Sequence, residues 1–305
     1  MFRVVSLGLL LAGPLFSPIG AAQEGPAATL ELTDCRISAS AGAPGIAARC
    51  ANFVRPLDPD NESLGNIELR VAVIPALTLE PASDPFVPIA GGPGQSSISF
   101  YAGWSAAFER VRQKRDIVLV DQRGTGDSAA MVCDVDDDVV DGKYSEEETR
   151  QLTEQCLELL PHDPRFFTTS VAVRDLEALR IALGYSAFNV YGISYGTRVA
   201  QHFARRYPAS TRTVIIDGVV PPQLPLGPDI ATESQIAVDY VFARCAENVA
   251  CNERFPNIAD DFALIRGALA EEPVTVEYQH PITGNREIID FTADHLAGAA
   301  WTTVA

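Results

Sequence analysis

Basic side chains are scarce in this sequence, where 23 lysines and arginines stand against 40 aspartates and glutamates, for a formal net charge of −17. Nucleic acids and anionic membrane surfaces attract basic patches, so this composition argues against both as partners. The densest acidic run, residues 134–148, lacks the spacing of a calcium-binding EF-hand loop. We interpret this run as a solvated loop that leads into a helix.

Histidine is also rare, with four residues, and no C-x-x-C motif occurs among the six cysteines. A structural metal site usually needs clustered cysteine and histidine ligands at short spacings. The sequence therefore argues against a bound metal, and nothing in it predicts another cofactor.

Long hydrophobic runs are absent as well. The run from Val4 to Phe16 is shorter than the ~20 apolar residues that span a bilayer. Arg3 precedes it, and the small residues 20–22 (Gly-Ala-Ala) that follow are suited to signal-peptidase cleavage. We therefore predict that residues 1–22 are an export signal and that the mature chain begins near Gln23. The protein would then be periplasmic or secreted, with no stable membrane insertion after cleavage.

The six cysteines favour disulfide bonds, because their number is even and an exported chain folds in an oxidising compartment. Six cysteines allow many pairings, and proximity along the chain favours three local ones. The favoured pairs are Cys35–Cys50, Cys133–Cys156 and Cys245–Cys251.

Strand-like and helix-like segments alternate along most of the chain. Apolar or alternating runs predict strands over residues 66–74, 86–90, 116–120, 188–191 and 213–216. Helical spacing predicts helices over residues 104–114, 145–160 and 169–183, and in the segment that ends at Pro208. Such alternation is typical of an α/β protein whose sheet is mainly parallel and carries helices on both faces.

The pattern changes at residues 219–222, Val-Val-Pro-Pro. From there to Glu271 it is helical, and a short strand follows over residues 274–278. We interpret residues 23–220 as the N-terminal part of an α/β core. Residues 221–305 would be an incomplete, largely helical lid inserted after the strand at 213–216.

Residues 192–196, Gly-Ile-Ser-Tyr-Gly, match the pattern G-x-S-x-G between a predicted strand and a predicted helix. On such a sharp turn the serine hydroxyl is pushed out of the sheet, and the glycines let the backbones pass closely. The helix N-terminus beneath the serine favours negative charge. Glycine and serine are common, so the match alone arises easily by chance. Its place between strand and helix is what favours Ser194 as a nucleophile.

Two glycine-rich loops follow other predicted strands, G-G-P-G-Q-S at 91–96 and D-Q-R-G-T-G-D-S at 121–128. Together with G-I-S-Y-G-T at 192–197, these motifs resemble those of the α/β-hydrolase serine peptidases. Within that fold, the proline iminopeptidase and tripeptidyl aminopeptidase-like family is the most similar group. The resemblance covers roughly residues 65–305, and the export signal and lid cysteines resemble the secreted tripeptidyl aminopeptidase-like branch.

The resemblance implies an aminopeptidase that releases N-terminal residues or short peptides through an acyl-enzyme at Ser194. It also implies an oxyanion hole formed by the N–H groups of Tyr195 and Gly92, with Gly92 favoured over Gly91. Removing one such donor costs about 3 kcal/mol of transition-state stabilisation. The residues that would support the active-site loops are Asp121, Gln122 and Arg123. All three are equally compatible with a purely structural turn.

Several alternatives stay open. Ala90 stands where many iminopeptidases have histidine, which argues against strict proline specificity. An esterase of the same fold usually has H-G-G-G in its oxyanion loop, and a third hypothesis is a non-catalytic binding protein. The substrate would be a peptide or a small ester.

An exopeptidase also needs a carboxylate that binds the substrate's ammonium group. The predicted lid contains Glu233 and Asp239, but we interpret both as solvent-facing.

The catalytic acid and histidine follow the nucleophile in this fold. His162 precedes it, and His202 lies roughly 12 Å farther along the predicted helix. His280 and His295 fall in the predicted lid, and we interpret Asp217, at the end of a strand, as mainly structural. We therefore expect the triad acid and base to lie outside these residues, the late core strands to be missing, and residues 23–305 alone to be inactive.

Overall fold

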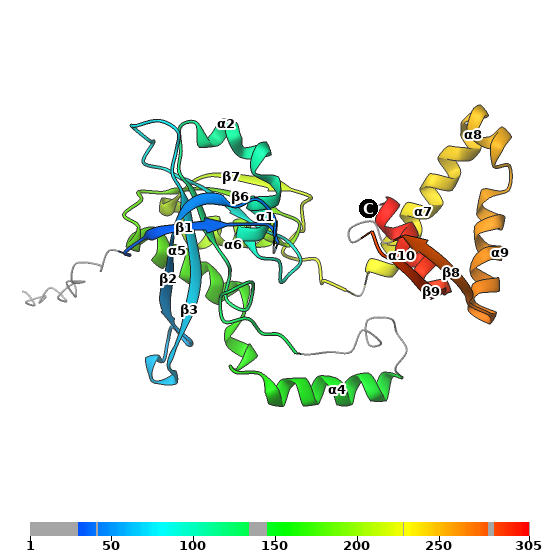
Figure 1. Ribbon diagram of the computed structural model, residues 1–305, viewed down its shortest axis with the longest axis horizontal. Coiled ribbons are helices and arrows are strands. Elements are labelled where there is room, and N and C mark those ends of the chain that lie inside the picture. Colours follow the sequence, from blue (N-terminus) through cyan, green and yellow to red (C-terminus); the bar gives the residue numbers. More distant parts are fainter. Residues whose placement is uncertain (1–29, 41, 134–144, 228, 280–283, 305) are drawn as a thin grey trace, which may run out of the picture.

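The computed structural model describes residues 30–40, 42–133, 145–227, 229–279 and 284–304. Figure 1 shows a β-sheet flanked by helices and a second, mainly helical unit that follows it in the chain. The predicted export signal and most of the acidic run lie outside the described residues. Within these ranges, no helix combines the length and the apolar character needed to cross a bilayer.

The main sheet has seven strands, in the order β1-β2-β3-β5-β4-β6-β7. They are β1 (Thr33–Ile37), β2 (Ile46–Pro56), β3 (Asn66–Ile74), β4 (Phe86–Ile89), β5 (Ile117–Val120), β6 (Phe188–Ile193) and β7 (Thr211–Asp217). Strands β5, β4, β6 and β7 run parallel to one another. Strands β1, β2, β3 and β5 pair antiparallel, so the sheet is mixed with a parallel core.

The prediction of a mainly parallel sheet is wrong for its N-terminal half. The connections between β1, β2 and β3, residues 38–45 and 57–65, are short. A parallel pair needs a crossover of about a dozen residues or more, so these connections force antiparallel pairing. The sequence pattern does not predict β2, because Ala47, Ala48 and Ala51 occupy it and alanine is depleted in strands.

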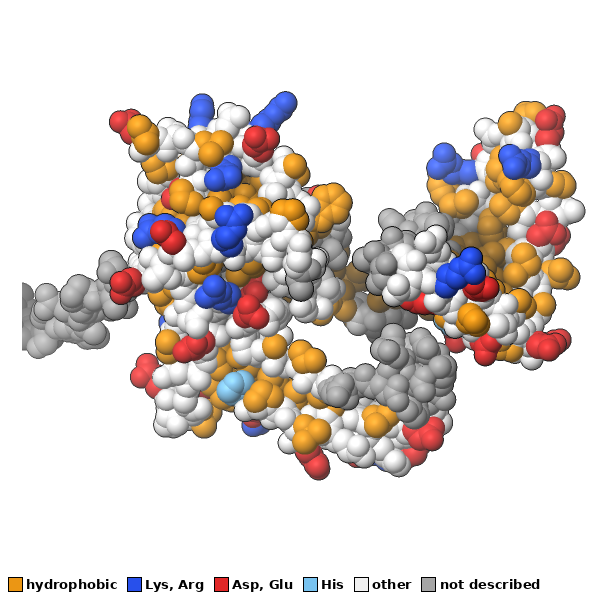
Figure 2. Space-filling view, viewed as in Figure 1, with side chains coloured by type: hydrophobic (Ala, Val, Ile, Leu, Met, Phe, Trp, Pro, Cys, Tyr) orange, Lys and Arg blue, Asp and Glu red, His pale blue; other side chains and the backbone are white. Residues whose placement is uncertain are grey.

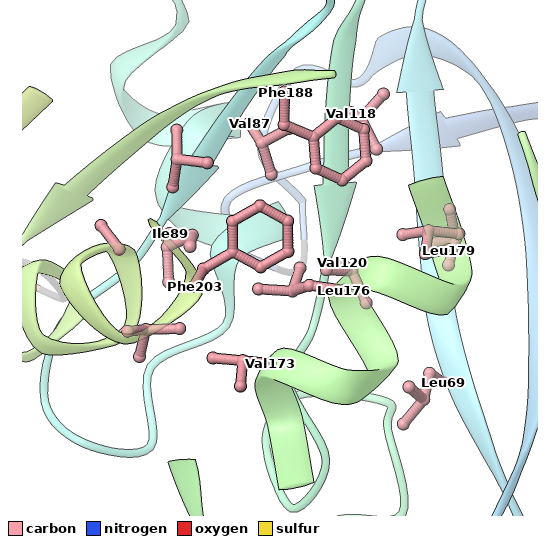
Figure 3. Close-up of a cluster of buried hydrophobic side chains, with 14 of the residues drawn as sticks. Leu69, Val87, Ile89, Val118, Val120, Val173, Leu176, Leu179, Phe188 and Phe203 are labelled. Carbon is pink, nitrogen blue, oxygen red and sulfur yellow. The ribbon is translucent and has the colours of Figure 1, made fainter. Parts of the chain in front are cut away.

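Helices lie on both faces of the sheet. The helices of this part of the chain are α1 (Ser97–Trp104), α2 (Glu109–Arg112), α4 (Glu146–Leu159), α5 (Thr169–Ala182) and α6 (Tyr195–Arg206), and not all of them contact the sheet. Helices α5 and α6 pack on one face through buried residues such as Leu176 and Phe203 (Figure 3). Helix α1 packs on the other face through Ile98 and Tyr101. In contrast, α4 extends away from the sheet and buries none of its residues (Figure 1).

Helix α1 begins earlier than the sequence pattern predicts. The predicted helix over 104–114 corresponds to a 3₁₀ turn, Ser105–Phe108, and the short α2, while α1 already starts at Ser97. Ser96 caps α1, because its Oγ accepts a hydrogen bond from the Ser99 N–H at 3.0 Å. Ser96, the last residue of the glycine-rich motif, is thus also the N-cap residue of α1.

A buried carboxylate ties together the N-terminal ends of the parallel strands. Asp84, just before β4, accepts hydrogen bonds on Oδ2 from Asn189 of β6 at 2.9 Å and from Arg115 at 3.2 Å. Arg212 of β7 forms an ion pair with the same oxygen at 2.7 Å. Burial opposes ionisation, but the hydrogen bonds from Asn189 and Arg115 outweigh it and hold the pKa of Asp84 below its ordinary value of 3.8.

Replacing Asp84 with asparagine is expected to lower the free energy of unfolding near neutral pH, with a loss that shrinks in acid. A carboxyl group with a lowered folded-state pKa stabilises the fold above its unfolded pKa, and this contribution disappears as the pH falls through the folded-state value. Urea unfolding at about pH 7 and at successive steps below 3.8 measures the difference. The exposed Asp34 of β1 provides the control substitution. A loss that stays constant into acid would contradict this role for Asp84.

The chain after β7 forms a second unit of helices and one hairpin. Its elements are α7 (Ile230–Glu247), α8 (Val249–Arg254), α9 (Ile258–Glu271), β8 (Val274–Gln279), β9 (Arg286–Phe291) and α10 (Ala293–Val304). Helix α7 packs against the other three helices. Figure 2 shows apolar side chains over the surface of this unit, and the exposed ones include Ile236, Tyr240 and Leu264. We call residues 229–304 the C-terminal unit.

Strand β7 lies at the edge of the main sheet, and its apolar side chains are exposed. Val214, Ile215 and Ile216 expose 38%, 47% and 41% of their surface. An edge strand also presents unpaired backbone groups. In the described part of the sheet, β7 is therefore an edge strand with exposed apolar side chains, paired on one side only, with β6.

Three disulfides join the cysteine pairs that proximity along the sequence favours. Cys35–Cys50 connects β1 to β2, with the Cα atoms 5.8 Å apart. Cys133–Cys156 joins the segment after the 121–128 loop to α4, and Cys245–Cys251 joins α7 to α8, with Cα atoms 5.7 and 5.1 Å apart. All three separations lie within the ~7 Å that a disulfide can bridge.

Candidate active site at the end of strand β6

Ser194 occupies the turn between β6 and α6 in a strained conformation. Its backbone has φ 53° and ψ −123°, a region that side chains other than glycine rarely adopt. Such strain costs about 1–3 kcal/mol and persists where the surroundings hold it in place. The Ser194 N–H donates to the Asp217 carbonyl at the end of β7, at 2.9 Å. The turn is therefore fixed by the neighbouring strand as well as by its own helix.

The two glycines of the motif are required by backbone contacts. A Cβ added to Gly192 would lie 2.2 Å from the Gly196 carbonyl oxygen. A Cβ added to Gly196 would lie 2.3 Å from the Ile89 carbonyl oxygen of β4. Neither backbone atom can move aside as a flexible side chain would. The first turn of α6 thus passes so close to β4 and β6 that only glycine fits.

The 91–96 loop lies directly against Ser194. A Cβ built on Gly91 would be 2.9 Å from the Ser194 Cβ and 3.3 Å from its Oγ. The Gly91 N–H donates to the side-chain oxygen of Gln95 at 3.2 Å, so it is already engaged. The N–H groups of Gly92 and Tyr195 have no acceptor among the described residues. Both N–H groups belong to the segments that meet at Ser194, since Gly92 follows Gly91 and Tyr195 follows the serine.

Asp121 connects the 121–128 loop to the start of α1. It is 3% exposed, and its Oδ1 accepts hydrogen bonds from the Ser96 Oγ at 2.7 Å and the Ile98 N–H at 3.1 Å. Burial raises the pKa of Asp121, against these two hydrogen bonds. A Cβ on Gly126 would lie 2.1 Å from its Oδ2, so the loop folds tightly over the carboxylate. Asp121 therefore holds the segment that follows the 91–95 turn.

Arg123 is buried in an ion pair with a distant aspartate. Its Nε and Nη2 donate to the Asp175 carboxylate of α5 at 2.7 and 3.0 Å, and its side chain is 1% exposed. Its Nη1 donates to the Leu57 carbonyl at 2.8 Å and the Phe166 carbonyl at 3.0 Å. Arg55 supplies a second cation to Asp175 at 3.0 Å. Gln122, between Asp121 and Arg123, is only partly buried and lines a small cavity.

Asp217 has a partner that the sequence pattern does not reveal. The Tyr191 hydroxyl donates to its Oδ2 at 2.7 Å, across from β6 to β7. Burial and this carboxylate raise the pKa of Tyr191 to about 12, so the hydroxyl keeps its proton. Since the Asp217 carbonyl holds the Ser194 N–H, the tyrosine indirectly fixes the turn of the serine.

The histidines of the described residues have other neighbours. The His162 ring stacks on Phe167, and Nδ1 of His295 is 2.9 Å from the Thr292 hydroxyl. Burial and nearby arginines lower the pKa of His202, which lines a separate cavity with Arg198 and Arg205. His280 lies outside the described residues. In the described ranges no side chain is hydrogen-bonded to the Ser194 hydroxyl, and no cluster of three or more metal-ligating side chains occurs.

The family model described as alpha/beta hydrolase fold matches residues 84–244, more than half of the 305-residue chain. The chain belongs to the α/β-hydrolase family. The serine protease Hip1 of Mycobacterium tuberculosis is 32% identical over 243 residues, which cover 73% of this chain and 46% of the relative. The tripeptidyl aminopeptidase of Streptomyces lividans is 30% identical over 231 residues, covering 66% and 41%. The chain thus spans less than half the length of these relatives.

A solved structure with a similar fold is the proline iminopeptidase of Mycobacterium smegmatis. The two chains are 16% identical, with a TM-score of 0.39, and the alignment covers 83% of this chain and 68% of the iminopeptidase chain. The α/β-hydrolase assignment of the present chain rests on the family match. Within that family, the strained serine turn and the glycine-rich loop beside it are the part of the site that local sequence patterns predict. The partners Asp175 and Tyr191 are the part that they miss.

Proposed function

We propose that this chain is the nucleophile-bearing part of an exported serine peptidase, in which Ser194 attacks a peptide carbonyl. One observation carries the proposal. The strained Ser194 turn lies against the 91–96 loop, and the neighbouring N–H groups of Gly92 and Tyr195 have no acceptor among the described residues. A backbone arranged in this way is ready to receive a negative charge as it forms.

The reaction would begin when the Ser194 Oγ attacks the carbonyl carbon. The carbonyl oxygen then becomes an oxyanion that accepts hydrogen bonds from Gly92 and Tyr195. The hydroxyl proton passes to a general base and from there to the leaving amine, so that the N-terminal fragment remains as an ester on the serine. Water hydrolyses this ester and restores the hydroxyl. No described histidine is hydrogen-bonded to the Ser194 hydroxyl, so the general base is not assigned to any of them.

Peptides are favoured over esters as substrates. The relatives with the names serine protease Hip1 and tripeptidyl aminopeptidase support a peptidase. The loop beside Ser194 contains G-G-P-G, whereas esterases of this family usually have H-G-G-G. We further propose that the enzyme is an aminopeptidase, which releases N-terminal residues or short peptides.

The division of the chain and its location are part of the same proposal. Residues 23–220 would form the hydrolase core and residues 221–305 a lid over the site. Three disulfides support folding in an oxidising compartment, hence export. We assign no lid carboxylate to the substrate's ammonium group. Glu233 and Asp239 are both exposed, and Asp239 already accepts a hydrogen bond from Gln235 of its own helix at 2.8 Å.

Substrate panels on the purified full natural chain test the aminopeptidase proposal. Tripeptidyl coumarin amides with a free N-terminus are expected to turn over at least about tenfold faster than their N-acetylated forms, because capture of an ammonium group contributes to transition-state binding. A panel of p-nitrophenyl esters is the comparison. Turnover of esters without amides would support an esterase instead. Turnover of neither, with no labelling by a fluorophosphonate, would support a binding protein.

A further inference from the structure

A small cavity of about 250 Å³ lies beside the candidate active site, at the ends of the parallel strands. Its lining includes Pro93, Gly94, Gln122, Met131, Phe167 and Tyr195. Pockets for whole small-molecule ligands usually measure about 300–1,000 Å³. This cavity is therefore of a size for one amino-acid side chain rather than for a complete ligand.

The walls of the cavity are held firmly. The Phe167 ring packs under the Arg123 guanidinium, with 5.9 Å between the guanidinium carbon and the ring centroid, and stacks on the His162 ring at 6.0 Å. A Cβ on Gly124 would lie 2.9 Å from Phe167 Cδ1. Another wall residue, Tyr195, is hydrogen-bonded through its hydroxyl to Thr169 at 2.6 Å. A preformed cavity of this kind can discriminate between side chains by shape.

The chemistry of the lining is mainly apolar. Arg123 forms part of the wall but has no free hydrogen-bond donor, because its guanidinium nitrogens donate to Asp175 and to backbone carbonyls. The lining also has polar groups on Gln122, whose side-chain amide has no hydrogen-bond partner in the described parts of the chain, and on Thr125, whose hydroxyl donates to the Gln122 carbonyl at 2.9 Å. Met131 is unbranched and adapts to differently shaped apolar groups. A basic side chain would find no carboxylate in this lining, and an acidic one would find no free donor on Arg123, whose nitrogens are all hydrogen-bonded.

The position of the cavity links it to the reaction. Pro93 and Gly94 directly follow Gly92, and Tyr195 directly follows Ser194, so its walls continue the two segments that would hold the oxyanion. A Cβ on Gly94 would meet no atom within 4 Å, so this side of the loop is open. We propose that the cavity receives an apolar side chain of the substrate residue whose carbonyl Ser194 attacks. This inference rests on the proposed peptidase function and specifies its substrate class.

The test is a change of substrate preference in Met131→Trp, with Val132→Trp as the matched control. Met131 lines the cavity, whereas the neighbouring Val132 is 76% exposed and lies outside the lining. The assay measures kcat/KM of the full natural chain on tripeptidyl coumarin amides that end in alanine, leucine, phenylalanine or aspartate. The unmodified protein is expected to prefer leucine and phenylalanine over aspartate by at least about tenfold.

Met131→Trp should lower kcat/KM for the leucine and phenylalanine substrates by about tenfold or more, and leave the alanine substrate nearly unchanged. Val132→Trp should change none of them. An equal loss on all substrates, or no change, would overturn the cavity assignment while the peptidase function stands. If the unmodified protein is labelled by a fluorophosphonate but cleaves no peptide, the proposed function itself fails and this inference fails with it.

Discussion

Replacing Ser194 with alanine is expected to lower kcat for peptide hydrolysis by on the order of 10⁶-fold in the full natural chain. The substitution removes the oxygen that forms the acyl-enzyme and leaves the rest of the site in place. Alanine keeps a Cβ, so the turn at φ 53° stays as strained as before and the melting temperature should barely change. Steady-state kinetics and thermal unfolding of both proteins provide the two readouts.

Ser194→Gly is the informative companion to the alanine variant. Glycine adopts positive φ without a steric penalty, so this variant should be equally inactive and more stable than the unmodified protein. Inactivity together with increased stability would show that the strain at this turn is maintained for the reaction. If Ser194→Ala retained most of its activity, another residue would be the nucleophile.

Replacing Asp175 with asparagine is expected to destabilise the fold by about 3–5 kcal/mol, because it leaves the buried Arg123 without its counter-ion. Both side chains of the pair are almost fully buried, at 1% and 4% exposure, and Arg55 adds a second cation to the same carboxylate. Urea unfolding of both proteins measures the loss. Activity should fall as well, since Arg123 anchors the loop after β5 to α5.

A matched control for Asp175→Asn lies on the same helix. Arg174 of α5 forms an ion pair with Asp60 at 2.8 Å, but the Asp60 side chain is 77% exposed. Exposed pairs contribute little to stability because water and salt screen them. Arg174→Ala should therefore shift the unfolding curve far less than Asp175→Asn. Equal shifts would show that burial of the Arg123–Asp175 pair is not what makes it important.

The parts of the structure that the sequence predicts are those with local signals. Strand β3 has the predicted bounds, 66–74, because apolar and polar residues alternate over its first half and a continuous apolar run, Val71 to Ile74, completes it. The turn at Ser194 follows from two glycines at fixed spacing around the serine, and each disulfide closes a local loop. In each case the residues that determine the feature are close together in the chain.

The parts that the sequence misses depend on residues far apart in the chain. Arg123 meets Asp175 only after the sheet and α5 have assembled, and Tyr191 meets Asp217 only across two paired strands. No spacing rule connects such pairs. The antiparallel half of the sheet is missed for a different reason, because the alanine-rich β2 carries little strand propensity.

Mass spectrometry of the full natural chain after reaction with a fluorophosphonate tests most directly whether Ser194 is the nucleophile that would carry the acyl group. We expect a single phosphonyl adduct on the peptide that contains Ser194, absent from Ser194→Ala and suppressed when a tripeptide amide competes for the site. An adduct on a different residue, or none in a folded protein, would show that Ser194 is not the nucleophile.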